Sequence, residues 1–496
     1  MRKIFTYILL FTCATSLAQT VTTSNVSRLV NREEVKNIIG SNDSLIYVLK
    51  RHNPTFSASK FEIDVYNKQL NKVSNIPIEL PFSDNNANIN IKEIFVQNNT
   101  PYVYYEADDR AARKITALVY NYSRSASTIL GSLSYDKTNR PPSFKVNSDS
   151  TGILFVGQPP YEKTSNEIYE ISRYSEDLTL LWKEKLELPY TAQNFVLEKI
   201  KFYNDNVFIL GNTNFEKSFN NPEKFILIRY DNTTKTIKEF ELSLTGKWIN
   251  SATFEVAPNN KLYVGGFYSN DKSFSIAGTF FLSIDLTTNQ ISEKSIKPFG
   301  EQFLSEFLPP RKVKKGGELS SFYFDHFIVK PNGGAIFVAE QYFKSISTYN
   351  DIASGFVNYS TIYYYNDIIV VSVDEEGQIE WNKKVAKKQY SVNDYGYFLS
   401  YALTYFNDNL YIYFNDHPRN INLPNREQNL RYMNYPQRAI VVQAKINANG
   451  DLSYSEVKTE KNNLILRPKL SCRTNDNRLI MPTEKSKLYG LIQIAP

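Results

Sequence analysis

The chain has 496 residues, of which 42% are hydrophobic and 14% aromatic, and its formal net charge is +6. The near balance of 57 basic and 51 acidic residues gives no indication of a nucleic-acid partner, which normally requires a strongly basic domain. Ordinary numbers of glycine (19) and proline (21) exclude a collagen-like or mainly disordered chain, and 35 Tyr and 32 Phe favour strands over helices. We therefore expect an all-β fold.

Residues 1–18 have the pattern of a secretory signal peptide. A basic start precedes a short apolar run over 4–11, and Ala18 occupies a suitable cleavage position. The run is shorter than the ~20 apolar residues of a membrane span, and no later segment qualifies, so no membrane span is expected. A lipid anchor on Cys13 is not expected, because Thr12 stands where a lipoprotein signal has a small residue. These features predict a periplasmic protein.

Cleavage after Ala18 changes the charge and the cysteine content of the mature chain. It removes two basic residues, Arg2 and Lys3, which leaves a formal net charge of +4. Cys472 then remains as the single cysteine, so no intramolecular disulfide is expected. The stability of the fold must therefore come from its hydrophobic core.

A polar turn followed by an apolar strand recurs eight times along the chain. The copy at 405–413 reads as two strands joined by an Asn-Asp turn. Hairpin turns need positive φ, which Asn, Asp and Gly tolerate best. The turns lie near positions 42, 98, 149, 204, 259, 332, 408 and 475. This regular spacing is typical of the blades of a β-propeller.

Each repeat is interpreted as a four-stranded antiparallel meander with strands a, b, c and d. The last repeat ends with strand c at 488–494 and lacks a fourth strand. Because an open propeller would expose a sheet edge, we expect residues 21–30 to supply the missing strand. The sequence predicts one β-propeller domain over 19–496, with eight blades closed by the N-terminal strand. The alternative is seven blades followed by a C-terminal tail.

Three insertions lengthen the later repeats, at 297–320, 343–366 and 415–437. They join d5 to a6, b6 to c6 and b7 to c7, connections that share one face of a propeller. Loops longer than ~12 to 15 residues are often functional, and Tyr and Arg are enriched in binding hot spots. We therefore predict a basic and aromatic protein-binding surface; the alternative is that the insertions have no function. The candidate contact residues are Phe303, Phe307, Arg311, Lys312, Lys314, Lys315, Tyr349, Tyr359, Tyr364, Arg419, Arg426, Arg431, Tyr432 and Tyr435.

Catalytic motifs are absent from the sequence, which has no nucleophile elbow, zinc-protease motif, phosphate-binding loop or paired-cysteine metal site. We predict no catalytic residue, cofactor or metal. The histidines His52, His326 and His417 fit hydrogen-bonded structural positions better than catalytic ones, although Asp–His pairs such as Asp325-His326 can orient an imidazole. Inner-strand acids such as Asp325 and Glu255 leave open a glycan-cleaving site in the central channel.

Two segments that end in Trp182 and Trp381 resemble the c–d turn and strand of quinoprotein-type eight-bladed propellers, where a Trp docks between blades. The paired cysteines and cofactor ligands of quinone enzymes are absent. The resemblance therefore implies the non-enzymatic branch, periplasmic propellers that act as scaffolds for outer-membrane machinery. The processing site and the Asn, Lys and Tyr content are also similar to those of envelope proteins of Bacteroidota.

These patterns predict a non-catalytic periplasmic propeller that binds another envelope or outer-membrane protein. The narrower hypothesis is an accessory or gating subunit of a type 9 secretion translocon. The alternatives are a propeller glycosidase or polysaccharide lyase, or a glycan-binding protein, with its site in the central channel. The sequence does not define the oligomeric state.

Overall fold

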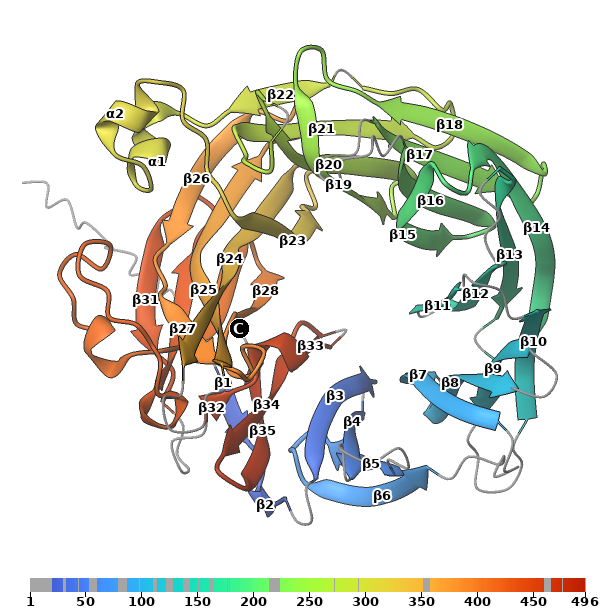
Figure 1. The fold of residues 1–496 in the computed structure, drawn as a ribbon, viewed down its shortest axis with the longest axis horizontal. Coiled ribbons are helices and arrows are strands. Elements are labelled where there is room, and N and C mark those ends of the chain that lie inside the picture. Colours follow the sequence, from blue (N-terminus) through green and yellow to red (C-terminus); the bar gives the residue numbers. More distant parts are fainter. Residues whose placement is uncertain are drawn as a thin grey trace, which may run out of the picture.

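A computed structural model of the chain shows eight antiparallel β-sheets arranged in a ring, each forming one blade (Figure 1). The predicted signal peptide lies outside the described residues. The structure describes residues 20–29, 33–42, 44–52, 60–78, 87–97, 99–109, 114–121, 128–136, 143–149, 151–159, 164–175, 177, 179–213, 224–271, 273–292, 294–350, 357–458, 465–474 and 476–495.

The first seven blades follow the chain, and each begins at its innermost strand (Figure 1). Blade one has β3 (Glu34–Ser41), β4 (Leu45–His52), β5 (Lys60–Asn67) and β6 (Lys72–Ile78). Blade two has β7 (Ala87–Gln97), β8 (Thr100–Asp109), β9 (Lys114–Asn121) and β10 (Thr128–Asp136). Blade three has β11 (Ser143–Asp149), β12 (Gly152–Gln158), β13 (Asn166–Tyr174) and β14 (Leu180–Thr191). Blade four has β15 (Phe195–Tyr203), β16 (Asn206–Thr213), β17 (Lys224–Asp231) and β18 (Thr236–Leu242).

The next three blades carry the predicted insertions. Blade five has β19 (Trp248–Ala257), β20 (Lys261–Ser269), β21 (Gly278–Asp285) and β22 (Ser295–Pro298). Blade six has β23 (Phe322–Val329), β24 (Ala335–Asn350), β25 (Val357–Val373) and β26 (Ile379–Val385), and β27 (Gln389–Val392) pairs with β25. Blade seven has β28 (Ala402–Phe406), β29 (Asn409–Asp416), β30 (Ile440–Ile446) and β31 (Leu452–Glu456).

The eighth blade is built from both ends of the chain. It contains β32 (Ile465–Leu466), β33 (Cys472–Arg473), β34 (Leu479–Lys485), β35 (Leu488–Ala495), β1 (Thr20–Thr23) and β2 (Ser27–Arg28). Strand β1 pairs antiparallel with β35, with Val21 opposite Ile494. The hydroxyl of Ser24 accepts a hydrogen bond of 2.8 Å from the backbone N–H of Leu491. Eight blades closed by an N-terminal strand are therefore confirmed, and the alternative of seven blades with a tail is wrong.

The predicted hairpin turns adopt the backbone conformation that their residues favour. Asn204 and Asn260 have φ of 51° and 58°, and Asn407 and Asp408 in the turn between β28 and β29 have φ of 47° and 55°. Left-handed backbone is costly for most residues and least so for Asn, Asp and Gly. The Asn-rich turns thus define where each a–b hairpin reverses.

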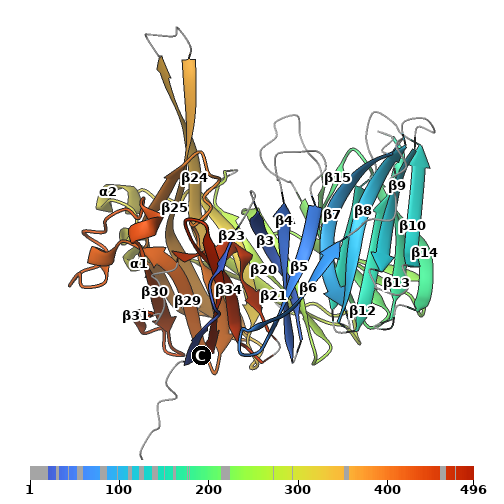
Figure 2. The ribbon, with the colours of Figure 1, turned by 90° about the horizontal axis from the view of Figure 1, so that it is seen from below.

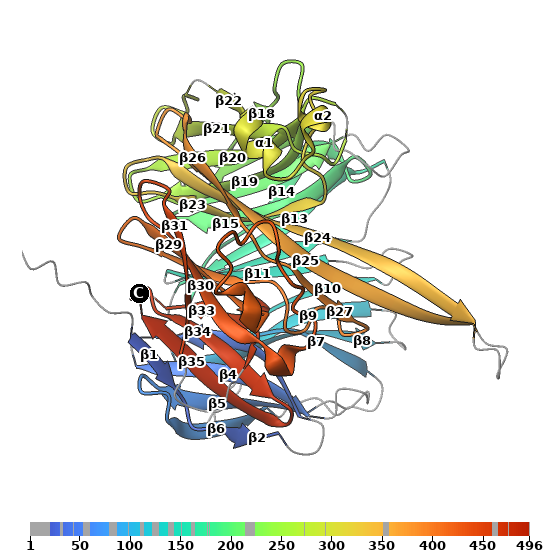
Figure 3. The same ribbon diagram turned by 90° about the vertical axis from the view of Figure 1, so that its left-hand side faces the viewer.

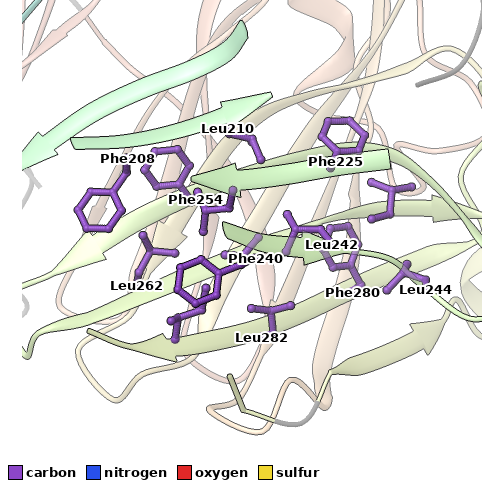
Figure 4. Packing of buried hydrophobic residues seen from close by; sticks show 14 of the residues in the cluster. Phe208, Leu210, Phe225, Phe240, Leu242, Leu244, Phe254, Leu262, Phe280 and Leu282 are labelled. Carbon is purple, nitrogen blue, oxygen red and sulfur yellow. The ribbon is translucent and has the colours of Figure 1, made fainter. Parts of the chain in front are cut away.

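The hydrophobic core lies between neighbouring blades. Figure 4 shows Phe208 and Leu210 of blade four packed against Phe254, Leu262 and further residues of blade five. Each of these four side chains is fully buried, and burial of one such side chain stabilises the fold by roughly 1.5 to 3 kcal/mol. Blade-to-blade packing of this kind fixes the inner strands around the middle of the ring.

The two tryptophans named in the sequence also lie between blades. Trp381 of β26 donates a 3.0 Å hydrogen bond from Nε1 to the carbonyl of Ala448 in blade seven. Trp182 of β14 makes an edge contact with Tyr230 of blade four, with 6.5 Å between ring centroids. Their positions agree with the interblade docking that the resemblance implied.

Among the residues that the structure describes, helical structure is confined to short segments. These are α1 (Glu301–Ser305), α2 (Pro310–Val313) and the 3-10 turns η1 (Pro418–Asn420), η2 (Pro436–Arg438) and η3 (Pro468–Leu470). Within the described part of the chain, no helix has the length and apolar character needed to cross a membrane.

Candidate functional site

The second insertion forms a long β-hairpin, which we call the arm: residues 342–350 of β24 and 357–365 of β25. The two strands pair in register from Tyr342 opposite Tyr365 to Asn350 opposite Val357. Figures 2 and 3 show the arm extending well beyond the ring of blades. The sequence predicted an insertion here but not a hairpin. Both halves contain several aromatic and β-branched residues, which favour strand pairing.

Most of the arm has no neighbouring strand on either edge in the described part of the chain. Strand β23 pairs with β24 only as far as Gln341, and β27 pairs with β25 only between Ile362 and Tyr365. Residues 343–350 and 357–360 therefore present outward-facing backbone N–H and C=O groups that are available to an additional strand, whereas both backbone groups of Thr361 already bond to Asn393.

Apolar side chains are exposed along the arm. Ile346 is 65% exposed, Tyr359 69% and Val357 49%. All three lie on the same face of the hairpin, because Ile346 is opposite Thr361 and the register then alternates. The backbone of Tyr349 pairs with Asn358 on the other face. One face of the arm thus exposes a strip of three apolar side chains, interspersed with Thr348 and Thr361, to a partner.

The third insertion meets the base of the arm through aromatic rings. On the opposite face of the hairpin, Phe343 stacks on Tyr364 with 4.6 Å between ring centroids. Tyr390 of β27 lies 5.9 Å from Tyr364 and 5.4 Å from Tyr432 of the third insertion. The second and third insertions therefore meet in one surface at the base of the arm.

A buried ion pair gives the third insertion its conformation. Arg426 pairs with Asp416, donates from Nε to the carbonyl of Ala386 at 3.0 Å and lies 4.3 Å from the ring of Tyr454. Arg426 is buried, so its prediction as a partner contact is wrong: the guanidinium satisfies a buried carboxylate instead. Arg419, Arg431, Tyr432 and Tyr435 are exposed on the same insertion.

The first insertion packs against the outer side of blade six. The ammonium of Lys384 in β26 donates to the carbonyl of Glu306 at 2.6 Å and lies 4.6 Å from the ring of Phe307, which is partly buried. Phe303 is only 3% exposed and packs between the rings of Phe299 and Phe307. Phe303 is therefore a core residue and not a surface contact. Arg311, Lys312, Lys314 and Lys315 are exposed on and after α2.

The inner strands hold a second group of polar residues. Asp325 and His326 of β23 line two cavities, one of about 580 Å³ and one of about 550 Å³. Glu255 lines the first cavity as well, but its carboxylate is paired with Lys199 at 2.9 Å and Lys201 at 2.5 Å. The two acids singled out from the sequence do share a cavity, and only Asp325 lacks a cationic partner among the described residues.

The environment of Asp325 and His326 changes their protonation. Both residues are exposed to solvent, although they lie on an inner strand and line the two cavities. Burial and the nearby carboxylate of Glu340 raise the pKa of Asp325 to about 7, against a 3.0 Å hydrogen bond from the Tyr401 hydroxyl. Burial lowers the pKa of His326 to about 4. At neutral pH the imidazole is neutral and the carboxyl group is partly protonated.

The other two histidines have structural partners. His417 caps η1 by accepting a 3.1 Å hydrogen bond on Nδ1 from the backbone of Arg419. His52 lies between two carboxylates, with Nδ1 3.3 Å from Glu33 and Nε2 3.2 Å from Glu62. The structural interpretation from the sequence therefore fits these two, whereas His326 faces a cavity, and we find no hydrogen bond of its imidazole within the described residues.

No protein-family model and no curated protein sequence matches the chain. Similar solved structures include the WD40 domain of SCAP from fission yeast, at 8% identity over 96% of this chain and 98% of that chain, with a TM-score of 0.41. Another is polysaccharide lyase Uly1, at 10% identity over 81% of this chain and 88% of that chain, with a TM-score of 0.37. Prolyl oligopeptidase B from Galerina marginata matches at 12% identity over 92% of this chain and 55% of that chain, with a TM-score of 0.40. The chain is a β-propeller, and these likenesses do not define its activity.

Proposed function

We propose that the protein is a non-catalytic interaction module of the periplasm, which binds another envelope protein through the arm and the adjoining third insertion. The observation that carries this proposal is the projecting hairpin with its exposed apolar strip. A two-stranded hairpin is marginally stable on its own in water, so the outer part of the arm gains stability when a partner covers it.

The arm offers two kinds of contact to such a partner. Its free backbone edges accept an added strand, which is a common mode of peptide recognition. Ile346, Val357 and Tyr359 supply apolar anchors beside those edges. Exposed apolar groups gathered in this way mark interaction sites more often than isolated ones do.

The surface around the base of the arm is basic and aromatic. The guanidinium of Arg438 lies 5.9 Å from the ring of Tyr435, and the ammonium of Lys388 lies 5.8 Å from the ring of Tyr432. Arg419 and Arg431 are exposed nearby on the same insertion. A partner with a polar or acidic rim around an apolar centre fits this arrangement.

The narrower proposal is an accessory or gating subunit of a type 9 secretion translocon. It rests on the sequence resemblance to periplasmic scaffold propellers and on the predicted signal peptide. Its test is the identity of the partner, because it requires an outer-membrane translocon subunit.

The experiment is crosslinking and affinity purification from the native envelope with two variants. In the first, residues 344–363 are replaced by Asn-Gly, which keeps Phe343 opposite Tyr364. In the second, Ile346→Asp and Tyr359→Asp place charges on the apolar strip. The matched control is Ile237→Asp, since Ile237 is an exposed apolar residue of β18, at 40%, far from the arm in the chain.

We expect the control to retain the partner in a stoichiometric complex and both arm variants to lose it while keeping the melting temperature of the ring. Equal recovery with the shortened arm contradicts the proposal. Recovery of an envelope protein that belongs to no translocon contradicts the narrower assignment alone.

A further inference from the structure

Three successive inner strands carry a β-bulge, and the extra residue of each bulge lines the same cavity. The register shifts between Leu197 and Lys199 in β15, between Ile249 and Ser251 in β19, and between Phe324 and His326 in β23. The extra residues are Glu198, Asn250 and Asp325, and all three line the cavity of about 580 Å³. Bulges redirect a side chain out of the normal alternation and are over-represented next to active sites.

Polar groups are frequent in the lining of this first cavity. Some of them both donate and accept hydrogen bonds, and others accept several hydrogen bonds at once. Asn212 donates to Glu198, and Asn250 is within reach of the carbonyls of Ser273 and Ser275, at 3.5 and 3.3 Å. Hydroxyl groups, amides, an imidazole and carboxyl groups occur together there. Such a set is suited to a ligand that carries many hydroxyl groups.

The second cavity, of about 550 Å³, has aromatic walls. Tyr342 lies 4.7 Å from Tyr365 and 5.6 Å from Tyr323, measured between ring centroids, and Tyr401 closes the same cavity. Tyr323 is 57% exposed, so one ring remains open to a ligand. Aromatic walls with a few convergent polar groups are the usual composition of a small-molecule site.

Asp325 and His326 connect the two cavities, because both residues line both of them. Asp325 accepts from Tyr401 and faces Glu340, whose own charge is paired with Lys387 at 2.7 Å. With a pKa of about 7 for Asp325 and about 4 for His326, both groups can donate and accept hydrogen bonds near neutral pH.

The charges around the cavities favour an uncharged ligand. Lys199 and Lys201 pair with Glu255, and Lys469 donates to the carbonyl of Tyr395 at 2.9 Å and to the hydroxyl of Tyr365 at 3.3 Å. No arginine is among the described residues that line either cavity. Lys469 has only neutral partners, but acidic residues outnumber basic ones in the two linings, where Glu198, Glu255, Asp325 and Glu340 stand against Lys199 and Lys469, and this disfavours an anionic ligand.

We infer that the two cavities form one binding site for a neutral oligosaccharide. The apolar ring face of a sugar stacks on the exposed ring of Tyr323, which Tyr342 supports from the side, and the sugar hydroxyls bond to Glu198, Asn250, Asp325 and His326. Aromatic stacking and dense hydroxyl bonding are both satisfied only by a ligand that combines flat apolar faces with many hydroxyl groups. This site is separate from the strip on the arm, since replacement of residues 344–363 leaves every lining residue in place.

The test is isothermal titration calorimetry on the full mature chain at pH 7. The probes are cellohexaose, chitohexaose and maltohexaose, with hexagalacturonate as the anionic comparison. The variants are Asp325→Asn, which keeps the shape of the side chain, and Tyr323→Ala, which removes an exposed ring. Tyr359→Ala on the arm is the control.

We expect at least one neutral hexasaccharide to bind, with Asp325→Asn and Tyr323→Ala each weakening the affinity by about tenfold or more and Tyr359→Ala leaving it unchanged. Melting curves of the same variants establish that they are folded. Absence of binding by all three neutral probes up to about 10 mM overturns the inference, as does unchanged affinity in both cavity variants. Tighter binding of hexagalacturonate overturns the assignment of a neutral ligand.

Discussion

Lys387 and Glu340 form an ion pair of 2.7 Å in which the lysine side chain is fully buried and the glutamate is 5% exposed. The carboxylate oxygen concerned has no well-aligned hydrogen bond, so the contact is chiefly electrostatic. Lys387 also donates to the carbonyl of Tyr365 at 2.8 Å, and Ser400 donates to Glu340 at 2.6 Å. The pair thereby fixes the base of the arm to the segment between β26 and β27.

The first prediction is that Lys387→Met destabilises the protein by about 3 to 5 kcal/mol, because it leaves a carboxylate buried without its cation. The double variant Lys387→Met with Glu340→Gln should recover part of this loss. The free energy of unfolding from urea titrations of the four proteins gives the coupling energy of the pair. A loss below about 1 kcal/mol in the single variant contradicts a role for the pair in stability.

The second prediction compares the two interblade tryptophans. Gly450, with φ of 83°, lies so close to Trp381 that a Cβ there would be 2.7 Å from the indole Cγ. Trp381 also donates to Ala448, whereas the buried Nε1 of Trp182 has no partner among the described residues. Trp381→Phe should therefore cost about 1 kcal/mol more than Trp182→Phe. The measurement is the urea midpoint of each variant. If both variants shift it equally, with the same dependence of the unfolding free energy on urea concentration, this explanation is contradicted.

The third prediction concerns closure of the ring. Deletion of residues 20–28 removes β1 and β2 and exposes the edge of β35, so we expect self-association in solution. Light scattering after size-exclusion chromatography measures this, with a chain that begins at residue 20 as the control. Ser24→Ala removes the hydroxyl that accepts from Leu491 and should cost about 1 kcal/mol without association. A deletion variant that stays monomeric and equally stable contradicts the role of β1.

The fourth prediction is a dependence of stability on pH that Asp325→Asn abolishes. The folded state holds the Asp325 proton up to a pKa of about 7, while the unfolded chain releases it near the ordinary value of 3.8. Protonated Asp325 therefore does not reduce the free energy of unfolding below pH 3.8. Between pH 3.8 and about 7 the free energy of unfolding falls as the pH rises, because the unfolded chain loses this proton first, and above pH 7 the effect is constant. The groups that face the carboxyl are Glu340, His326, Tyr401 and Lys387.

Relative to the native protein, Asp325→Asn should gain stability as the pH rises from 4 to 7. Because Asp325 still contacts solvent, the gain should be on the order of 1 kcal/mol. Urea unfolding at intervals across this range measures it, and Asp271→Asn provides a surface control. A difference between variant and native protein that is independent of pH shows that Asp325 titrates normally.

The fold was predictable because its signals are local and repeated. The a–b turns need residues that tolerate positive φ, such as Asn407-Asp408 in blade seven and Gly333 in blade six, and this requirement makes them recognisable in the sequence. The missing fourth strand of the last repeat could be inferred as well, since an open edge at β35 is unfavourable. The common face of the three insertions stays a prediction from strand order.

The side-chain environments were less predictable, because they depend on tertiary partners. Phe303 and Arg426 have the composition of contact residues, but one fills the core between blades five and six and the other neutralises Asp416. The bulge at Asp325 depends on the register with β24, which no single strand encodes. The arm was predicted only as an insertion, because nothing in the sequence of 343–366 defined its strand pairing or where the hairpin ends.

Closure by β1 and β35 also has a consequence for the order of folding. Ser24 and Leu491 are separated by 467 positions, so this contact forms only when almost all of the chain is present. At ~5 to 20 residues per second, synthesis leaves the first strand without its partner for tens of seconds or longer. During that interval the N-terminal strand has no partner, and its free backbone groups can pair with strands of other chains. Strand β35 thus completes the blade to which β1 belongs, and the ring closes only once both strands are present.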